Sequence, residues 1–183
     1  MEETVKTTSI PGLLVISRPT NSDGRGFFRE IARISDIENT SGVKFEVKQM
    51  NHARSVKNAL RGIHAAPWNK LIYVTSGKVK SVIIDLRPDS PAFGKHETFI
   101  LGDENPVSLF IPKGCGNSYI VLSEEADYTY LTDAQWEPGK EVSVIWNDPD
   151  LGIDWDLSEE PIVSERDKSN PSVREVFPQK FNS

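Results

Sequence analysis

Short runs of β-branched and aromatic residues recur along most of this chain, and they constrain its fold more than any other feature. Such residues favour extended backbone, and the residues between the runs, such as Ser76-Gly77 and Pro112-Lys113-Gly114, favour turns. Strands are expected at residues 12–17, 44–50, 71–75, 79–86, 97–101, 107–111, 118–122, 128–131 and 142–146. Many short strands at regular spacing predict an all-β sandwich or barrel.

Helices are expected to contribute little to this fold. One short helix is predicted near residues 34–40, and a polar tail is predicted after Asp167. The chain has 183 residues, which is enough for one well-buried domain, and no repeat, low-complexity tract or linker divides it. We therefore expect a single domain over residues 1–183.

Charge and composition exclude several classes of protein. The formal net charge of −6 argues against nucleic-acid binding, which depends on accumulated Lys and Arg. Cys115 is the only cysteine, so no internal disulfide can form, and His52, His64 and His96 do not provide a cluster of metal ligands. No apolar run is long enough for a signal peptide or a membrane span. We expect a cytoplasmic protein that binds neither nucleic acid nor membrane and uses no metal or other cofactor.

The stretch from Ala59 to Lys70 carries the most informative side chains. It places Arg61, His64 and Lys70 in a segment that otherwise reads as two strands and a tight connection. Alternate residues of a strand share a face, so bringing Arg61 and His64 to one pocket requires a twist or bulge, which Gly62 permits. Arg suits phosphate recognition, His transfers protons near neutral pH, and Lys supplies positive charge. The pattern predicts an anionic substrate that undergoes proton transfer; the alternative is an ordinary solvated strand edge.

Several motifs in a fixed order extend this interpretation. They are DGRGFFRE at 23–30, QMN at 49–51, LRGIH at 60–64, KLI at 70–72, DLR at 85–87, WNDP at 146–149 and SERD at 164–167. From about residue 10 to residue 167, the chain therefore resembles the dTDP-4-dehydrorhamnose 3,5-epimerase family. The resemblance implies a cupin-type jelly-roll β-sandwich with a few short helices that acts on nucleotide-linked 4-keto-6-deoxy sugars. It also implies a homodimer, for which pairing of N-terminal strands offers a physical route.

The resemblance also implies roles for the matched positions. His64 would remove a proton next to the sugar ketone, Asp167 would accept the other ring proton of His64, and Lys70 would face the oxyanion that develops at C4. Arg25 and Arg61 would hold the diphosphate. The other expected substrate contacts are Phe28, Glu30, Gln49, Asn51, Asn117, Tyr119, Tyr130 and Trp136. For Phe28, the alternative is a purely structural place in the core.

Three features depart from the family's pattern. Trp136 stands where the family carries the tyrosine that protonates the opposite face of the enolate, and an indole is too weak an acid for that step. Asn117 stands where many members carry a histidine, and Ala65-Ala66 replace a larger polar pair in a shortened connection. Tyr119, Tyr130 or water would then supply the second proton, and Trp136 would be a stacking platform for the base or the sugar.

The sequence thus predicts an epimerase that acts at C3, at C5 or at both carbons, in deoxysugar or surface-polysaccharide biosynthesis. The alternative is a non-catalytic sugar-nucleotide-binding protein derived from the same family. The pairing of His64 with Asp167 favours the enzyme, whereas Trp136 favours the binding protein.

Overall fold

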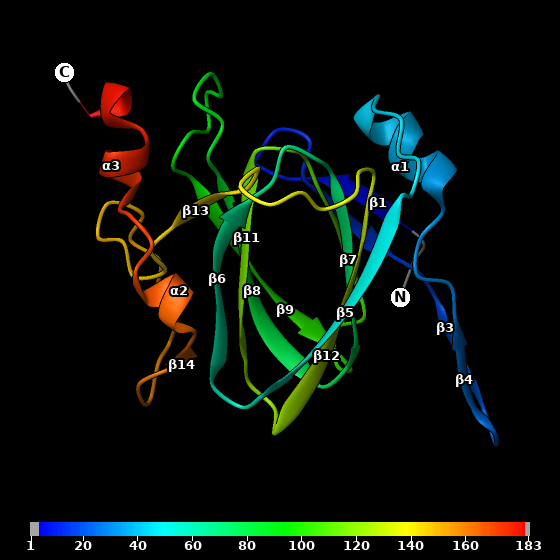
Figure 1. Cartoon of the computed structure of the whole chain (residues 1–183). Helices are drawn as coiled ribbons and strands as arrows, with labels where there is room; N and C mark the ends of the chain where they lie inside the picture. The colour runs from blue at the N-terminus through cyan, green and yellow to red at the C-terminus, as the bar shows by residue number, and fades with distance from the viewer. Residues whose placement is uncertain (1–3, 182–183) are drawn as a thin grey trace.

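Two β-sheets pack face to face in the computed structural model, which describes residues 4–181 (Figure 1). The first sheet is antiparallel, with its strands in the order β1 (Thr4–Thr7), β2 (Leu14–Ser17), β10 (Ser108–Ile111), β7 (Lys70–Ser76), β12 (Glu125–Thr132) and β5 (Gln49–Val56). The second has the order β13 (Val142–Val144), β6 (Ala59–Ala65), β11 (Cys115–Val121), β8 (Lys78–Asp85) and β9 (His96–Gly102). A short strand, β14 (Ile162–Val163), pairs in parallel with β6.

The main core lies between the two sheets because alternate residues of each strand point inward. Ile72 and Val74 of β7 meet Val79 and Ile83 of β8 there, and all four are buried. This alternation is the pattern expected for strands with one face in a core. The expected all-β sandwich with a few short helices is confirmed.

A helix and an extended segment cover the outer face of the first sheet. Helix α1 (Ile34–Ser41) confirms the helix predicted at 34–40. The strand predicted at 44–50 is wrong in its position, because the strand at this place, β5, starts only at Gln49. Phe45 instead packs its ring edge-to-face on Phe110, with 5.3 Å between ring centroids. The apolar residues before Gln49 thus cover the sheet rather than extend it.

The C-terminal segment covers the outer face of the second sheet (Figure 1). It contains α2 (Glu165–Lys168), α3 (Val173–Val176) and a 3₁₀ helix (Pro178–Lys180). The polar tail predicted after Asp167 is therefore wrong in part, because Val173 and Phe177 are buried. They pack in one cluster with Val82 and Ile84 of β8.

A hairpin that the sequence did not predict stands apart from the two sheets. Its strands are β3 (Thr20–Asp23) and β4 (Gly26–Arg29), and it projects beyond β5 in Figure 1. Phe27 and Phe28 on this hairpin are 64% and 74% exposed. At its base, Arg29 donates a 2.5 Å hydrogen bond to the hydroxyl of Tyr73. Across residues 4–181, no helix is long and apolar enough to span a membrane.

Candidate active site

A β-bulge in β6 turns two functional side chains toward the same side of the sheet. His64 pairs with Asn117 and Arg61 pairs with Tyr119, so three steps along β6 face two steps along β11. The extra residue lies within Gly62-Ile63, and Arg61 and His64 consequently line one pocket while Ile63 enters the outer core. The predicted bulge at Gly62 is confirmed.

A carboxylate fills a gap on the other edge of β6. There β13 pairs with residues 63–65 and β14 pairs with residues 59–60. Between these partners, the N–H of Gly62 donates to Asp167 Oδ2 at 3.2 Å. Asp167 belongs to α2, whose N-cap Ser164 accepts a hydrogen bond from the Asp167 N–H. The gap in strand pairing therefore fixes where this carboxylate enters the site.

The same carboxylate binds the imidazole of His64. Asp167 Oδ1 lies 2.7 Å from His64 Nε2. Burial alone would raise the pKa of Asp167, but the hydrogen bond and charge of His64, with the Gly62 amide, hold that pKa well below its usual range. Because the pKa is depressed in the folded state, the interaction stabilises the fold at neutral pH and is lost only in the acid range. An ionised carboxylate only accepts hydrogen bonds, so Nε2 carries the proton and Nδ1 is free to accept one.

Gly62 leaves no room for a side chain beside Asp167. A Cβ at this position would lie 2.7 Å from Asp167 Cγ and 2.9 Å from its Oδ1. We expect Gly62→Ala to lower the free energy of unfolding by about 1–3 kcal/mol and to displace the carboxylate from His64. Chemical denaturation and the downfield resonance of the His64 ring N–H measure the two effects.

The matched control is Gly24→Ala, because a Cβ on Gly24 would have no atom within 4 Å. This variant should keep both the wild-type stability and the His64 resonance. A Gly62→Ala protein with both properties unchanged would contradict the proposed crowding.

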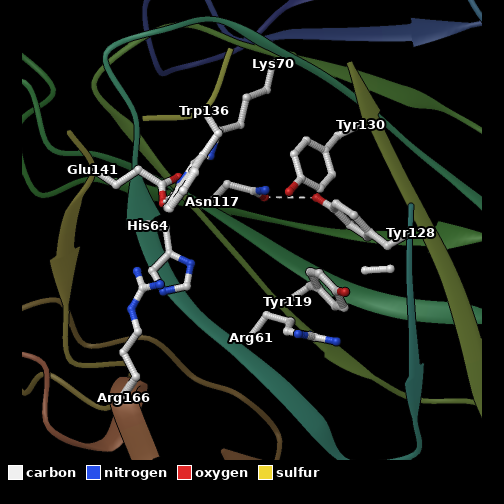
Figure 2. A pocket seen from close by; sticks show the side chains of 11 residues that line it. Arg61, His64, Lys70, Asn117, Tyr119, Tyr128, Tyr130, Trp136, Glu141 and Arg166 are labelled. Atoms are coloured by element: carbon white, nitrogen blue, oxygen red, sulfur yellow. Dashed lines mark hydrogen bonds and ion pairs between the residues drawn. The ribbon is translucent and has the colours of Figure 1, made fainter. Parts of the chain in front are cut away.

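The bulge and the gap lie at a pocket of about 280 Å³ between the sheets (Figure 2). It is lined by Ala53, Arg61, His64, Lys70, Asn117, Tyr119, Tyr128, Tyr130, Trp136, Glu141 and Arg166. An adjoining pocket shares Lys70, Tyr130, Trp136 and Glu141 and adds Gln49, Asn51, Trp68 and Thr132. The two chambers thus share the first four of these side chains.

Lys70 is the buried cation of this site. Burial lowers the pKa of Lys70, and Glu141 partly offsets this effect because its Oε1 lies 3.7 Å from Nζ. The indole N–H of Trp136 donates to the other oxygen of Glu141 at 3.3 Å. Sequence reasoning missed Glu141, since one acidic residue in a loop carries no distinguishing signal. It also gave Arg166 no role, although this residue precedes Asp167 in the SERD motif.

Three tyrosines from both sheets line the side of the pocket that lies away from His64 in Figure 2. Tyr119 and Tyr128 stack with 4.1 Å between ring centroids and 9° between planes, and the Tyr128 hydroxyl donates to Asn117 Oδ1 at 3.0 Å. Tyr130 is half-buried, and its burial and the nearby Glu141 raise its pKa. Burial also raises the pKa of Tyr128, so the phenols of Tyr128 and Tyr130 are both protonated at neutral pH.

The predicted contacts on β5 hold the rim of the site. Gln49 Nε2 donates to Asn51 Oδ1 at 2.8 Å, and Gln49 Oε1 accepts the backbone N–H of Trp136 at 2.8 Å. Arg61 donates to Ser55 Oγ through Nη2 at 3.0 Å. These contacts preset the positions of the Trp136 loop and the Arg61 guanidinium.

Three predicted substrate contacts lie away from the two pockets that share Lys70 and Tyr130. Arg25 is 90% exposed and pairs with Asp23 at the tip of the β3–β4 hairpin. Phe28 is exposed on the same hairpin, so its alternative place in the core is contradicted. Glu30 forms ion pairs with Arg18 and Arg33. A single copy of the chain does not bring these three side chains to His64.

No group of three His, Cys, Asp or Glu residues within residues 4–181 is arranged to hold a metal ion. Cys115 is buried, and burial raises the pKa of its thiol to about 12. The thiol is thus protonated at neutral pH.

A β-sandwich with an aspartate-bound histidine and a buried lysine in the space between its sheets fits a cupin-type isomerase. The sequence pattern of the dTDP-4-dehydrorhamnose 3,5-epimerase family matches residues 7–175, and the chain belongs to this family. The predicted cupin-type fold and the predicted epimerase class are both confirmed.

Named relatives include enzymes that differ in their carbon specificity. The chain is 37% identical to dTDP-4-dehydrorhamnose 3,5-epimerase of Pseudomonas aeruginosa over 171 residues, 92% of this chain and 94% of that protein. It is similar in structure to a 4-keto-6-deoxy sugar epimerase from the novobiocin biosynthetic gene cluster of Streptomyces spheroides, with a TM-score of 0.93, 27% identity and coverage of 99% and 92% of the two chains. A 3′-monoepimerase from Streptomyces bikiniensis in complex with dTDP-quinovose matches with a TM-score of 0.89, 31% identity and coverage of 95% and 90%. The comparisons favour the enzyme over the alternative of a non-catalytic binding protein.

Proposed function

We propose that the protein epimerises a nucleotide-linked 4-keto-6-deoxy sugar, with dTDP as the nucleotide, at C3, C5 or both carbons. The observation that carries this proposal is the hydrogen bond between His64 and Asp167 in a pocket that also contains the buried Lys70. The dTDP moiety is supported by the ligand of the Streptomyces bikiniensis monoepimerase.

In the first step, His64 removes a proton from a carbon next to the ketone. The C–H bond breaks, its electron pair moves toward the C4 oxygen, and the proton goes to Nδ1 of His64. Asp167 stabilises the resulting imidazolium through Nε2, and the positive charge of Lys70 stabilises the enolate oxygen. Such carbon acids are very weak in water, so the step needs both a placed base and a placed charge.

In the second step, Tyr130 returns a proton from the opposite side. His64 belongs to β6 in the second sheet and Tyr130 to β12 in the first, and Figure 2 shows them on opposite sides of the pocket. The hydroxyl of Tyr128 is already donated to Asn117, and the indole N–H of Trp136 to Glu141. Tyr119 belongs to β11, which pairs with β6 in the same sheet as His64, so Tyr130 has the phenol that is best placed to protonate the enolate with inversion.

The remaining side chains of the two pockets hold the substrate. Arg61 binds the diphosphate, since its guanidinium faces the pocket and can donate to two oxygens at once. Asn51 lines the adjoining chamber together with Gln49, and Trp136, which borders both chambers, stacks on the base or the sugar. Cys115 is a buried free thiol, which fits a cytoplasmic enzyme of deoxysugar or polysaccharide biosynthesis.

A homodimer accounts for the predicted contacts that lie outside the pocket of one copy. The β3–β4 hairpin exposes two phenylalanines and carries Arg25 at its tip. Packed against a second copy, it buries these rings and brings Arg25, Phe28 and Glu30 toward that copy's substrate. We expect the double variant Phe27→Ser/Phe28→Ser to be monomeric in analytical ultracentrifugation, whereas Val56→Ser, an exposed apolar residue on β5, keeps the dimer. A wild-type monomer would contradict this assembly.

Catalysis is expected to survive exhaustive chelation, because the proposed steps use only side chains of this chain. After dialysis against EDTA and 1,10-phenanthroline, α-proton exchange should stay within about twofold of the untreated rate. Loss of exchange that zinc, iron or manganese restores would show that a metal takes part.

The decisive experiment is NMR of dTDP-4-keto-6-deoxyglucose incubated with the protein in heavy water. Deuterium at C3, at C5 or at both carbons supports the proposed function and identifies the reacting centre. If a tightly bound keto sugar acquires no deuterium at either carbon, the protein binds sugar nucleotides without catalysis.

A further inference from the structure

The hydroxyl of Tyr119 is buried but makes no hydrogen bond with any residue of the described chain. The residue is only 4% exposed, and its side chain lines the pocket of His64. A buried polar group without a partner is unfavourable, and such groups are rare in native structures. A bound molecule in the pocket is therefore needed to satisfy this hydroxyl.

Packing alone does not explain the hydroxyl. Tyr119 stacks flat on Tyr128, and a phenylalanine ring would fill the same space. In the same stack, the Tyr128 hydroxyl does have a protein partner, Asn117. Of these two hydroxyl groups, only that of Tyr119 lacks a protein partner, so we assign it to a ligand.

The position of Tyr119 indicates which part of the ligand it meets. Tyr119 pairs with Arg61 across β11 and β6, and the next facing pair is Asn117 with His64. In Figure 2, Tyr119 lies beside Arg61, whereas Lys70 lies at the far end of the pocket. With the diphosphate at Arg61 and the ketone at Lys70, the sugar spans the pocket from C1 to C4. Tyr119 is then next to C1, and the neighbouring ring substituent able to form a hydrogen bond is the hydroxyl group on C2.

We propose that Tyr119 is a specificity-determining residue that hydrogen-bonds the 2-hydroxyl group of the sugar, so that the protein selects 2-hydroxy over 2-deoxy 4-keto sugars. This inference rests on the proposed function for the orientation of the sugar. A site that hydrogen-bonds a substrate hydroxyl discriminates against the analogue lacking it, because the buried group of the protein is then left unpaired.

The test compares dTDP-4-keto-6-deoxyglucose with its 2-deoxy analogue. The wild-type protein should show a kcat/KM for α-proton exchange about tenfold higher with the 2-hydroxy sugar. Tyr119→Phe should lose about tenfold with that sugar and stay within about twofold of wild type with the 2-deoxy sugar. Tyr128→Phe, which removes the other hydroxyl of the same stack, should keep the wild-type preference between the two sugars.

A Tyr119→Phe protein with the wild-type preference would overturn the inference and assign the hydroxyl to a bound water molecule. Failure of the proposed function gives a different result, because then neither sugar exchanges with the wild-type protein. In that case, calorimetric affinities of wild type and Tyr119→Phe for dTDP-glucose and dTDP-2-deoxyglucose test the contact without catalysis. A preference for dTDP-glucose that disappears in Tyr119→Phe supports it, and equal preferences in both proteins overturn it.

Discussion

Replacing His64 with asparagine is expected to slow exchange of the sugar's α-protons by about 10²–10⁴-fold, the usual contribution of a positioned base. Asparagine keeps a polar side chain near Asp167 but has no basic nitrogen, so the proton has no acceptor. Binding of dTDP should change little, because the proposed diphosphate contact is Arg61. Exchange is measured by NMR in heavy water, and binding by calorimetry.

The chain offers a matched control for this variant. His52 Nε2 also lies 2.7 Å from an aspartate, Asp127, but His52 is 57% exposed and lies outside the pocket of His64. His52→Asn should therefore exchange α-protons at the wild-type rate. Rapid α-proton exchange by a folded His64→Asn protein would contradict the assignment of His64 as the base.

Replacing Tyr130 with phenylalanine is expected to separate proton exchange from inversion. His64 still forms the enolate and returns a proton to the same face, so deuterium enters the substrate. Inversion should fall by about 10²–10⁴-fold, because no phenol remains to protonate the opposite face. NMR of the sugar resolves both quantities, since the retained and inverted products have different ring couplings.

Trp136→Tyr tests the rival location for the acid. It adds a phenol at the position where the resemblance implies one, on a residue that lines the same two chambers as Tyr130. If Tyr130 is the acid, Trp136→Tyr leaves the ratio of inversion to exchange unchanged in an otherwise wild-type protein. A large rise in that ratio would mean that the wild-type protein lacks an efficient acid. Full inversion by the Tyr130→Phe protein would instead assign the role of the acid to Tyr119 or to water.

The sequence predicted those parts of the molecule whose residues serve one structural purpose, such as packing in the core. Strands β7 and β8 are buried along most of their length, and their continuous runs of apolar and β-branched residues were placed well. The bulge at Gly62 followed from an odd spacing between two chemically informative side chains. The pairing of His64 with Asp167 followed only from resemblance, because no local pattern connects residues 103 positions apart.

The errors in prediction fall where function or assembly overrides periodicity. The inward residues of β5, which include Gln49 and Asn51, are polar or small because they border the pocket, so no apolar alternation indicates a strand. Strand β3 is exposed at every position and gives no signal either. In the C-terminal segment, the apolar positions are few and far apart, although Val173 and Phe177 are buried one helical turn from each other.

The gap in strand pairing along β6 is filled by a residue near the C-terminus, so the site is completed only late in the synthesis of the chain. Apart from β14, the strands of the two sheets lie within residues 4–144, but the partner of the Gly62 amide is 105 residues away, in α2. During translation, the imidazole of His64 therefore lacks its oriented partner until the segment after β14 has left the ribosome and docked. Docking of this last segment completes the hydrogen bond to His64, so under the proposed function a nascent or clipped chain with assembled sheets would lack an oriented base.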